Sequence, residues 1–189
     1  MTPARSRYRS PAPAPKPRLD PMPNARAELD ALFARLGIEP VSIEHPPVHT
    51  VEEALPYWET LEGVHTKNLL LKGAKGGLWL VCVPSDRRLD LKALAAHLGA
   101  KKFSFASAET LLAALDVVQG SVSPLALVND KAGAVTLVLA KDMLAAPRIT
   151  VHPLTNTATL SLVSTELLAV VEATGHRPAI VDFDALDAP

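Results

Sequence analysis

Three short stretches of the sequence carry residues that could do chemistry together. Lys67 and Asn68 stand at the start of an apolar run, where a strand would hold them at the rim of a sheet. The loop from Gly120 to Pro124 has a glycine that lets the backbone approach a ligand closely and a proline that stiffens it. His152 ends a further apolar run. Together they could bind a polar ligand and direct backbone amides at a developing negative charge.

Each stretch also has a simpler explanation. A lysine at a strand end is usually solvated, and a Gly-x-x-x-Pro loop is usually only a turn. His152 could merely bond to a backbone group. From spacing alone, a shared site and three unrelated structural roles both remain open.

Other patterns that suggest chemistry fail on their spacing. His45 and His49 are four residues apart with two glutamates nearby, but two prolines between them exclude the helical geometry of a zinc motif. The glycine-rich stretch at 73–77 lies between two expected strands and lacks the phosphate-loop pattern. Cys82 lies within an apolar run and reads as a small core residue. We therefore expect no metal and no cysteine nucleophile.

The composition fits one folded domain. The chain has 189 residues, is 48% hydrophobic and 4% aromatic, and has a net charge of -1. This charge does not indicate a nucleic-acid-binding protein, so such a role would need a local patch. A single cysteine excludes an internal disulfide framework and favours a reducing, cytoplasmic setting. The apolar runs are too short for a membrane span, and we expect no membrane anchor.

A composition change separates the N-terminal segment from the rest of the chain. Residues 1–23 hold seven of the 17 prolines and five basic residues against one acidic residue. Such a segment cannot bury enough apolar surface to fold. We expect a disordered, proline-rich tail at 1–23 and a single domain at 24–189.

Apolar periodicity and capping residues predict the elements of that domain. Thr50, followed by Glu53, predicts a helix with a capping box that Pro56 interrupts early. Other helices are predicted at 24–36, 90–98, 107–115 and 165–173. Strands are predicted at 41–43, 67–72, 78–83, 103–105, 125–128, 134–140, 148–152, 157–163 and 179–183. Because the elements mingle without a strict βαβ repeat, we expect an α+β fold with a mixed, largely antiparallel β-sheet and flanking helices.

Five stretches carry a resemblance to a known family. They are, in order, HPPVHTVEEA, HTKNLLLKG with WLVCVP, GSVSP, VHPLTNTATLSLV and GHRPAIVDF. In this order they resemble the YbaK-type aminoacyl-tRNA editing domains, and most closely the freestanding prolyl-tRNA editing proteins of the PrdX-like branch. The resemblance runs from about residue 24 to residue 183, and Lys67-Asn68 and the Gly120 loop are its most specific elements.

The resemblance implies hydrolysis of Ala-tRNA(Pro) in trans, with Pro-tRNA(Pro) left intact. Family members are understood to use no protein nucleophile and no cofactor, and the 2′-hydroxyl of the terminal adenosine helps to activate water. The implied partners are the 3′ end and acceptor stem of tRNA(Pro), and prolyl-tRNA synthetase. Two alternatives stay open: a deacylase for Cys-, Ser- or Thr-tRNA, and a tRNA-binding module that has lost hydrolysis.

The resemblance also implies residue roles. Lys67 would anchor the tRNA 3′ end and Asn68 would orient the aminoacyl group. His152 would line the pocket without acting as a base, and residues 50–62, starting at Thr50, would form a flexible lid. The amides that face the carbonyl oxygen would come from the loop that runs from Gly120 through Ser121, Val122 and Ser123 to Pro124, whose ring would stiffen it. Basic side chains that could contact the acceptor stem are Lys72, Lys75, Arg87, Arg88, Lys101 and Lys102.

Overall fold

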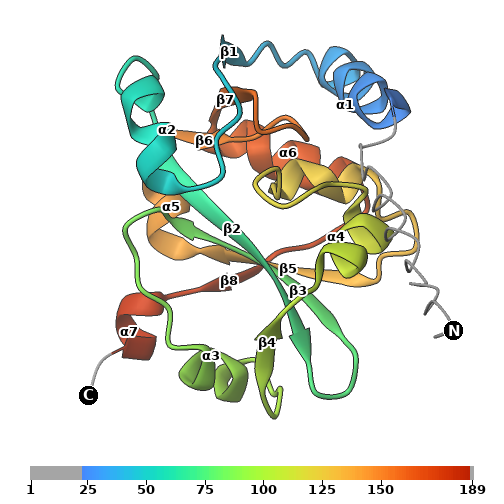
Figure 1. The fold of residues 1–189 in the computed structure, drawn as a ribbon, viewed down its shortest axis with the longest axis vertical. Coiled ribbons are helices and arrows are strands. Elements are labelled where there is room, and N and C mark those ends of the chain that lie inside the picture. The colour runs from blue at the N-terminus through green and yellow to red at the C-terminus, as the bar shows by residue number, and fades with distance from the viewer. Residues whose placement is uncertain (1–22, 188–189) are drawn as a thin grey trace, which may run out of the picture.

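A mixed eight-stranded sheet flanked by helices organises the chain (Figure 1). The structure is a computed structural model that describes residues 23–187, so the predicted tail lies outside the described residues except for its last position. The elements are α1 (Pro23–Leu36), β1 (Val41–Glu44), α2 (Val51–Trp58), β2 (Val64–Gly73), β3 (Leu78–Pro84), α3 (Leu91–His97), β4 (Phe103–Phe105), α4 (Ala108–Leu115), the 3-10 helix η1 (Pro124–Val128), β5 (Val135–Ala140), α5 (Lys141–Ala145), β6 (Arg148–Val151), β7 (Ala158–Val163), α6 (Ser164–Ala173), β8 (Ala179–Val181) and α7 (Phe183–Asp187).

The strand pairing confirms the expected fold class. The strands follow the order β1-β7-β6-β2-β3-β5-β8, and β4 pairs separately with β2. Over residues 23–187, four pairings are antiparallel (β1 with β7, β6 with β7, β2 with β3, β2 with β4). Three are parallel (β2 with β6, β3 with β5, β5 with β8). No helix in this range is long and apolar enough to cross a membrane.

One edge of β2 is open in the middle of the sheet. β3 pairs with β2 along one edge, while the other edge meets β6 at Val64 and His65 and β4 only from Leu71 onward. The described strands therefore leave this edge unpaired over 66–70. The Ala106 N–H donates to the Leu70 carbonyl across this edge at 2.9 Å. Because backbone direction alternates along a strand, the peptide groups two residues earlier also face the opening.

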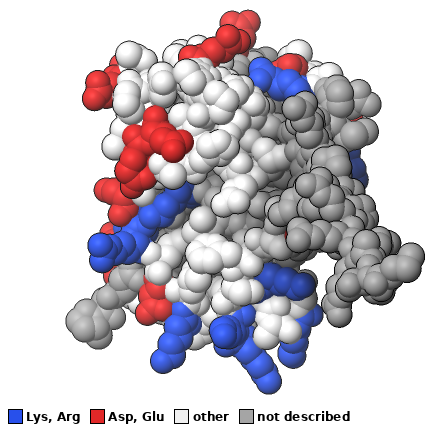
Figure 2. Space-filling model, viewed as in Figure 1, with Lys and Arg blue, Asp and Glu red and all other residues white. Residues whose placement is uncertain are grey.

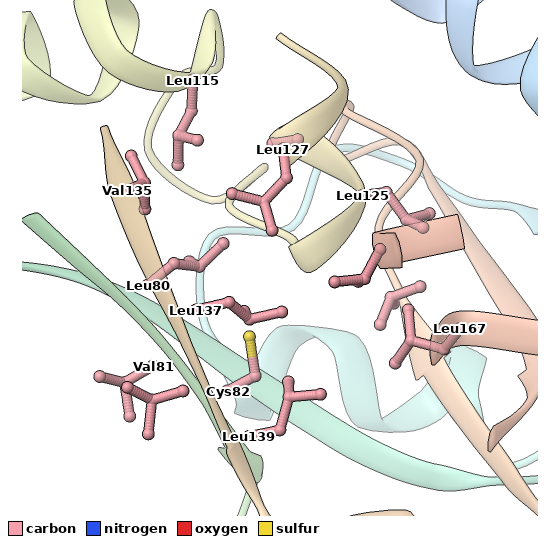
Figure 3. Packing of buried hydrophobic residues seen from close by; sticks show 14 of the residues in the cluster. Leu80, Val81, Cys82, Leu115, Leu125, Leu127, Val135, Leu137, Leu139 and Leu167 are labelled. Carbon is pink, nitrogen blue, oxygen red and sulfur yellow. The ribbon is translucent and has the colours of Figure 1, made fainter. Parts of the chain in front are cut away.

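The main core lies between the sheet and the helices η1 and α6 (Figure 3). Alternate side chains of β3 and β5 point toward these helices, and most are fully buried. Among them, Leu80, Cys82, Leu137 and Leu139 face Leu125, Leu127 and Leu167. Burying each leucine contributes roughly 1.5–3 kcal/mol, so this layer fixes β3 and β5, and β3 holds the neighbouring strand β2 that carries the site.

The strand predicted at 125–128 is wrong, because these residues form η1. Pro124 occupies the first turn, where its missing N–H costs nothing. The Ser123 hydroxyl accepts from the Leu125 N–H at 3.2 Å and caps the helix. All five residues of η1 are buried. A short, fully buried apolar run has no polar face, so its pattern cannot distinguish a strand from a helix.

The predicted interruption at Pro56 is also wrong, since α2 continues through Pro56 to Trp58. A proline removes one helical hydrogen bond, yet the Glu59 N–H still bonds to the Leu55 carbonyl at 3.3 Å. Trp58 is buried with Val48 in a small apolar cluster. This burial holds the last turn and offsets the lost bond.

Of the two hydrogen bonds of the predicted capping box, one is present at the start of α2. Thr50 is the N-cap, and its hydroxyl accepts from the Glu53 N–H at 3.3 Å. The Glu53 carboxylate accepts from the His49 N–H at 2.7 Å instead of from the Thr50 N–H. The reciprocal half of the box is thus displaced by one residue, and it ties the preceding loop to the helix.

Candidate active site

A cavity of about 420 Å³ lies at the open edge of β2. β2 contributes residues 66–70 to its lining. The loop before α2 and α2 itself contribute from the 48–58 segment, and the end of β4 with α4 contributes from 105–111. Residues from 119–122 and His152 complete the lining. Segments that are far apart in the sequence therefore meet where the sheet is interrupted.

Most of the predicted site residues meet in this cavity. Those that line it are Thr50, Lys67, Asn68, Gly120, Val122 and His152. Three others from the predicted loop are buried and do not line it, namely Ser121, Ser123 and Pro124. The loop thus offers the cavity its glycine and a valine, while its serines and proline hold the loop against the core.

Lys67 carries a partly buried positive charge at the cavity. Its ammonium donates to the backbone carbonyl of Arg87, in the loop after β3. Burial lowers the pKa of Lys67, and the nearby Asp86 carboxylate opposes this shift. The Arg87 guanidinium is itself fixed by Asp142 at 3.0 Å and by Asp184 at 2.6 Å. The lysine is therefore positioned through a loop that two carboxylates anchor.

Asn68 presents a buried acceptor. Its amide nitrogen donates to the Thr66 hydroxyl at 3.4 Å, and that hydroxyl donates to the Thr150 carbonyl at 2.8 Å. This chain orients the amide and leaves the Asn68 Oδ1 atom buried without a partner among the described residues. A buried unsatisfied acceptor is uncommon and costs free energy. It is well suited to accept a hydrogen bond from a ligand's amine.

Gly120 stands where other residues would not fit. Its φ is 89°, in the left-handed region, and a Cβ atom there would lie 3.2 Å from the Val48 carbonyl oxygen and 3.3 Å from His49 Nδ1. The Ser121 N–H is used by the Val118 carbonyl at 3.0 Å. The amides of residues 120 and 122 are therefore the ones that this loop could direct at a ligand.

His152 is held as a neutral imidazole. Its Nδ1 atom lies 2.9 Å from the Ala158 carbonyl, so Nδ1 carries the hydrogen and Nε2 is left as an acceptor. Burial lowers the pKa of His152, the Ala158 bond opposes the shift, and the His45 ring 6.2 Å away adds to it. The side chain can accept a hydrogen bond and limit the size of the cavity.

The cavity contains residues that the sequence did not single out. Trp58 stacks on His65 with 4.6 Å between ring centroids, and its N–H points at the Thr159 hydroxyl at 3.4 Å. Phe105 is 65% exposed. The Phe-Ser-Phe alternation suggests two buried aromatic rings, but only Phe103 is buried. His49 also lines the cavity, and its place in a proline-rich loop is typical of the rim of a site.

The side chains favour binding and polarisation over covalent catalysis. The two lining hydroxyls, on Thr50 and Thr66, are engaged in the helix cap and in the bond to Thr150. Cys82 is fully buried in β3, and burial raises the pKa of its thiol far from the neutral range. The arrangement can hold an ester, stabilise its oxyanion with amides and let water attack.

The chain belongs to the aminoacyl-tRNA editing-domain family, because residues 45–170 match the model of the aminoacyl-tRNA editing domain. The resemblance inferred from the motifs is thereby confirmed. The chain is 45% identical over 161 residues to prolyl-tRNA synthetase associated domain-containing protein 1 of Danio rerio, covering 84% of this chain and 88% of that protein. It is 36% identical over 156 residues to the prolyl-tRNA editing protein ProX of Acetoanaerobium sticklandii, covering 81% and 94%.

The fold also matches solved structures. One, described as a candidate trans-editing enzyme for prolyl tRNA synthetase, has a TM-score of 0.62 at 21% identity and covers 85% of this chain and 98% of that one. A hypothetical protein, APE2540, has a TM-score of 0.65 at 24% identity, covering 82% and 97%. At these identities the likeness establishes the fold, and the family assignment comes from the sequence matches.

Proposed function

We propose that this protein hydrolyses the ester of mischarged Ala-tRNA(Pro) and leaves Pro-tRNA(Pro) intact. The observation that carries the proposal is the meeting of Lys67, Asn68, Gly120 and His152 in one cavity of an aminoacyl-tRNA editing domain. The name of the bacterial relative, a prolyl-tRNA editing protein, supports the choice of tRNA. The partners are the 3′ end and acceptor stem of tRNA(Pro), and prolyl-tRNA synthetase, in the cytoplasm where tRNA is charged.

The reaction needs only positioning and charge stabilisation. Lys67 anchors a phosphate of the 3′ end, and Asn68 Oδ1 accepts from the α-ammonium of the amino acid. Water, activated by the 2′-hydroxyl of the terminal adenosine, adds to the ester carbonyl, and amides of the Gly120 loop stabilise the oxyanion. The bond to the 3′-oxygen then breaks, this oxygen takes a proton, and free alanine and tRNA leave.

Selectivity follows from the size of the cavity. Proline has two more carbons than alanine, and each missing methylene changes binding in a synthetase pocket by only about 1–3 kcal/mol, so some mischarging with the smaller alanine is expected. A second site corrects the error by rejecting the larger proline sterically. Here the close approach of Gly120 to the Val48 carbonyl and the His49 ring, together with the His152 ring, would set that limit.

A panel of aminoacyl-tRNAs tests the proposal. Purified protein is mixed with tRNA(Pro) carrying alanine or proline and with Cys-, Ser- and Thr-tRNA, and the release of each amino acid is measured. We expect rapid release of alanine and none of proline. Preferential release of cysteine, serine or threonine would contradict the alanine specificity. If no member is hydrolysed, the deacylase proposal fails in favour of a tRNA-binding module, which the family membership also allows.

A further inference from the structure

Phe105 presents an exposed aromatic ring at the cavity. It is the last residue of β4, it lines the cavity, and it is 65% exposed, whereas Phe103 on the same strand is 5% exposed. Phe103 packs edge-on against Trp79 with 4.9 Å between ring centroids. The strand is thus fixed by one ring while the other faces solvent. An exposed ring at the rim of a site is a surface that a ligand can cover.

Lysines surround the same end of the molecule. A second hollow of about 420 Å³ beside β4 is lined by Lys92, Lys101 and Lys102. Lys72, on the neighbouring strand, is exposed and lies opposite Ser104 in the β2–β4 register. Figure 2 shows basic atoms gathered at the end where Figure 1 draws α3 and β4. This cluster would attract a chain of phosphates.

The opposite side of the cavity carries negative charge. Acidic atoms gather over the region of α2 in Figure 2. Glu52 and Glu53 lie in its first turn, and Glu59 follows its end. A polyanion is therefore repelled from the α2 side and attracted to the β4 side. Single-stranded nucleic acid is commonly bound by this pairing of aromatic rings with a basic groove. An apolar peptide would gain nothing from the lysines.

We infer that Phe105 is the stacking platform for a base at the RNA 3′ end and that Lys101, Lys102 and Lys92 hold the adjoining phosphates. The inference rests on the proposed function, because an ester held in the cavity requires its nucleoside to lie at the mouth. The base stacks on Phe105, and the strand continues over the start of β4 toward the lysine hollow. Because every base has a face that can stack and every nucleotide has a phosphate, these contacts bind the RNA 3′ end without depending on its sequence.

Binding of RNA, measured apart from hydrolysis, tests this inference. A labelled single-stranded RNA ending in CCA is titrated with the full chain and its variants, and fluorescence anisotropy gives Kd. Stacking of one base predicts that Phe105→Ala weakens binding about 5- to 150-fold. Phe105→Leu should lose as much, because leucine keeps apolar area but has no ring, and Phe105→Trp should stay within about twofold of wild type. Ile180→Ala, at a residue 55% exposed on β8 and outside the cavity, is the matched control and should leave Kd unchanged.

A second titration tests the base and the phosphates. RNA that lacks its 3′-terminal base should bind wild type as weakly as Phe105→Ala binds intact RNA, and the variant should no longer differ from wild type. Lys101→Ala with Lys102→Ala should reduce the slope of log K against log salt by about 1.4, because each released phosphate contact contributes roughly 0.7. Lys131→Ala, whose lysine pairs with Glu28 at 2.5 Å, is the charge control and should keep the slope.

The outcomes separate this inference from the proposed function. Wild-type affinity in Phe105→Ala or Phe105→Leu, or no RNA binding by wild type, overturns the stacking role. The stacking role is also overturned if Phe105→Ala no longer binds prolyl-tRNA synthetase but still binds RNA, because the ring would then contact a protein. If the RNA results are as expected and no aminoacyl-tRNA is hydrolysed, stacking stands and the deacylase proposal fails. If aminoacyl-tRNA is hydrolysed but substitution of Phe105 does not change RNA binding, the deacylase proposal stands and the stacking role fails.

Discussion

The α2 wall and the β2–β4 wall enclose the same cavity but are held in place differently. The α2 wall rests on a cluster of three buried residues, Val48, Ala54 and Trp58, that is separate from the main core. The β2–β4 wall belongs to the main core, through residues such as Leu71 and Phe103. Local stability follows buried apolar contacts, so α2 is expected to open at lower free energy than the strands. The β2–β4 wall is therefore expected to be the rigid one, and the α2 wall the one that can open.

The two walls also differ in what they present to a ligand. Lys67, Asn68 and Phe105 lie on the strand wall, close to the lysine hollow. The α2 wall presents carboxylates outward and a tryptophan inward. The predicted lid at 50–62 therefore remains a proposal with a physical basis: a weakly anchored, acidic helix that closes over a substrate held by the basic wall. The predicted binding residues and the proposed closing helix therefore lie on different walls of the cavity.

Lys67→Ala should have the largest effect, because it removes the positive charge of the strand wall. We expect kcat/KM for Ala-tRNA(Pro) to fall about 100-fold or more, because the 3′ end loses the anchor that places the ester, with an unchanged urea midpoint. Thr50→Ala on the α2 wall is the counterpart and should reduce kcat/KM less than about 10-fold, with a loss of roughly 1 kcal/mol in stability from the cap. Equal losses of activity would erase the distinction between the walls.

The stability of the two walls can be compared with one substitution in each. Phe103→Ala should lower the global free energy of unfolding by about 3 kcal/mol, since it empties part of the main core. Trp58→Ala removes a larger ring, yet it should cost less globally and should mainly speed amide hydrogen exchange in 51–58. Urea unfolding and hydrogen exchange measure both. A global loss for Trp58→Ala as large as that for Phe103→Ala would show that α2 unfolds only with the whole domain.

The smallest expected effect is that of pH on the His152 side of the cavity. Burial holds the pKa of His152 below its ordinary value of about 6.5, so the ring is neutral at pH 7 and above. A lowered folded-state pKa means that stability is complete above pH 6.5 and is lost as pH falls through the folded value. Turnover should thus be flat from pH 8 to 6.5 and decline a few-fold below it. His97→Asn, at an exposed position on α3, should leave the profile unchanged, and a rise in turnover on acidification would contradict the neutral role.

The sequence predicted local structure well where one residue type decides it. Asp90 and Ser107, the first residues of two predicted helices, cap α3 and α4 through their side chains. The antiparallel hairpin of β2 and β3 follows from two apolar runs joined by glycines. Lys67 and Asn68 do lie on a strand beside the cavity, although they lie inside β2, which begins at Val64, and not at its start. These features depend on neighbours in the sequence, and so they can be read from it.

Features that depend on distant partners could not be read in the same way. The expected strand at 179–183 ends at Val181, and Phe183 begins α7, where its ring lies 5.8 Å from the Arg87 guanidinium. The five-residue α5 is too short to show a period. The bond from Lys67 to the Arg87 carbonyl spans 20 residues. The cavity itself arises from strand pairing, which no local pattern encodes.

The three-residue strand β8 affects how readily the protein aggregates in solution. The family match ends at residue 170, but β8 comes later and pairs with β5 at Val138, Leu139 and Ala140. β5 is the stretch VTLVLA, an uncharged, proline-free segment of the kind that forms intermolecular β-structure. A short strand is a safe way to end a sheet, because it offers few free backbone groups. β8 therefore covers an aggregation-prone strand. A protein shortened to the family boundary would expose the edge of β5 and would also lose Asp184, which helps to hold Arg87.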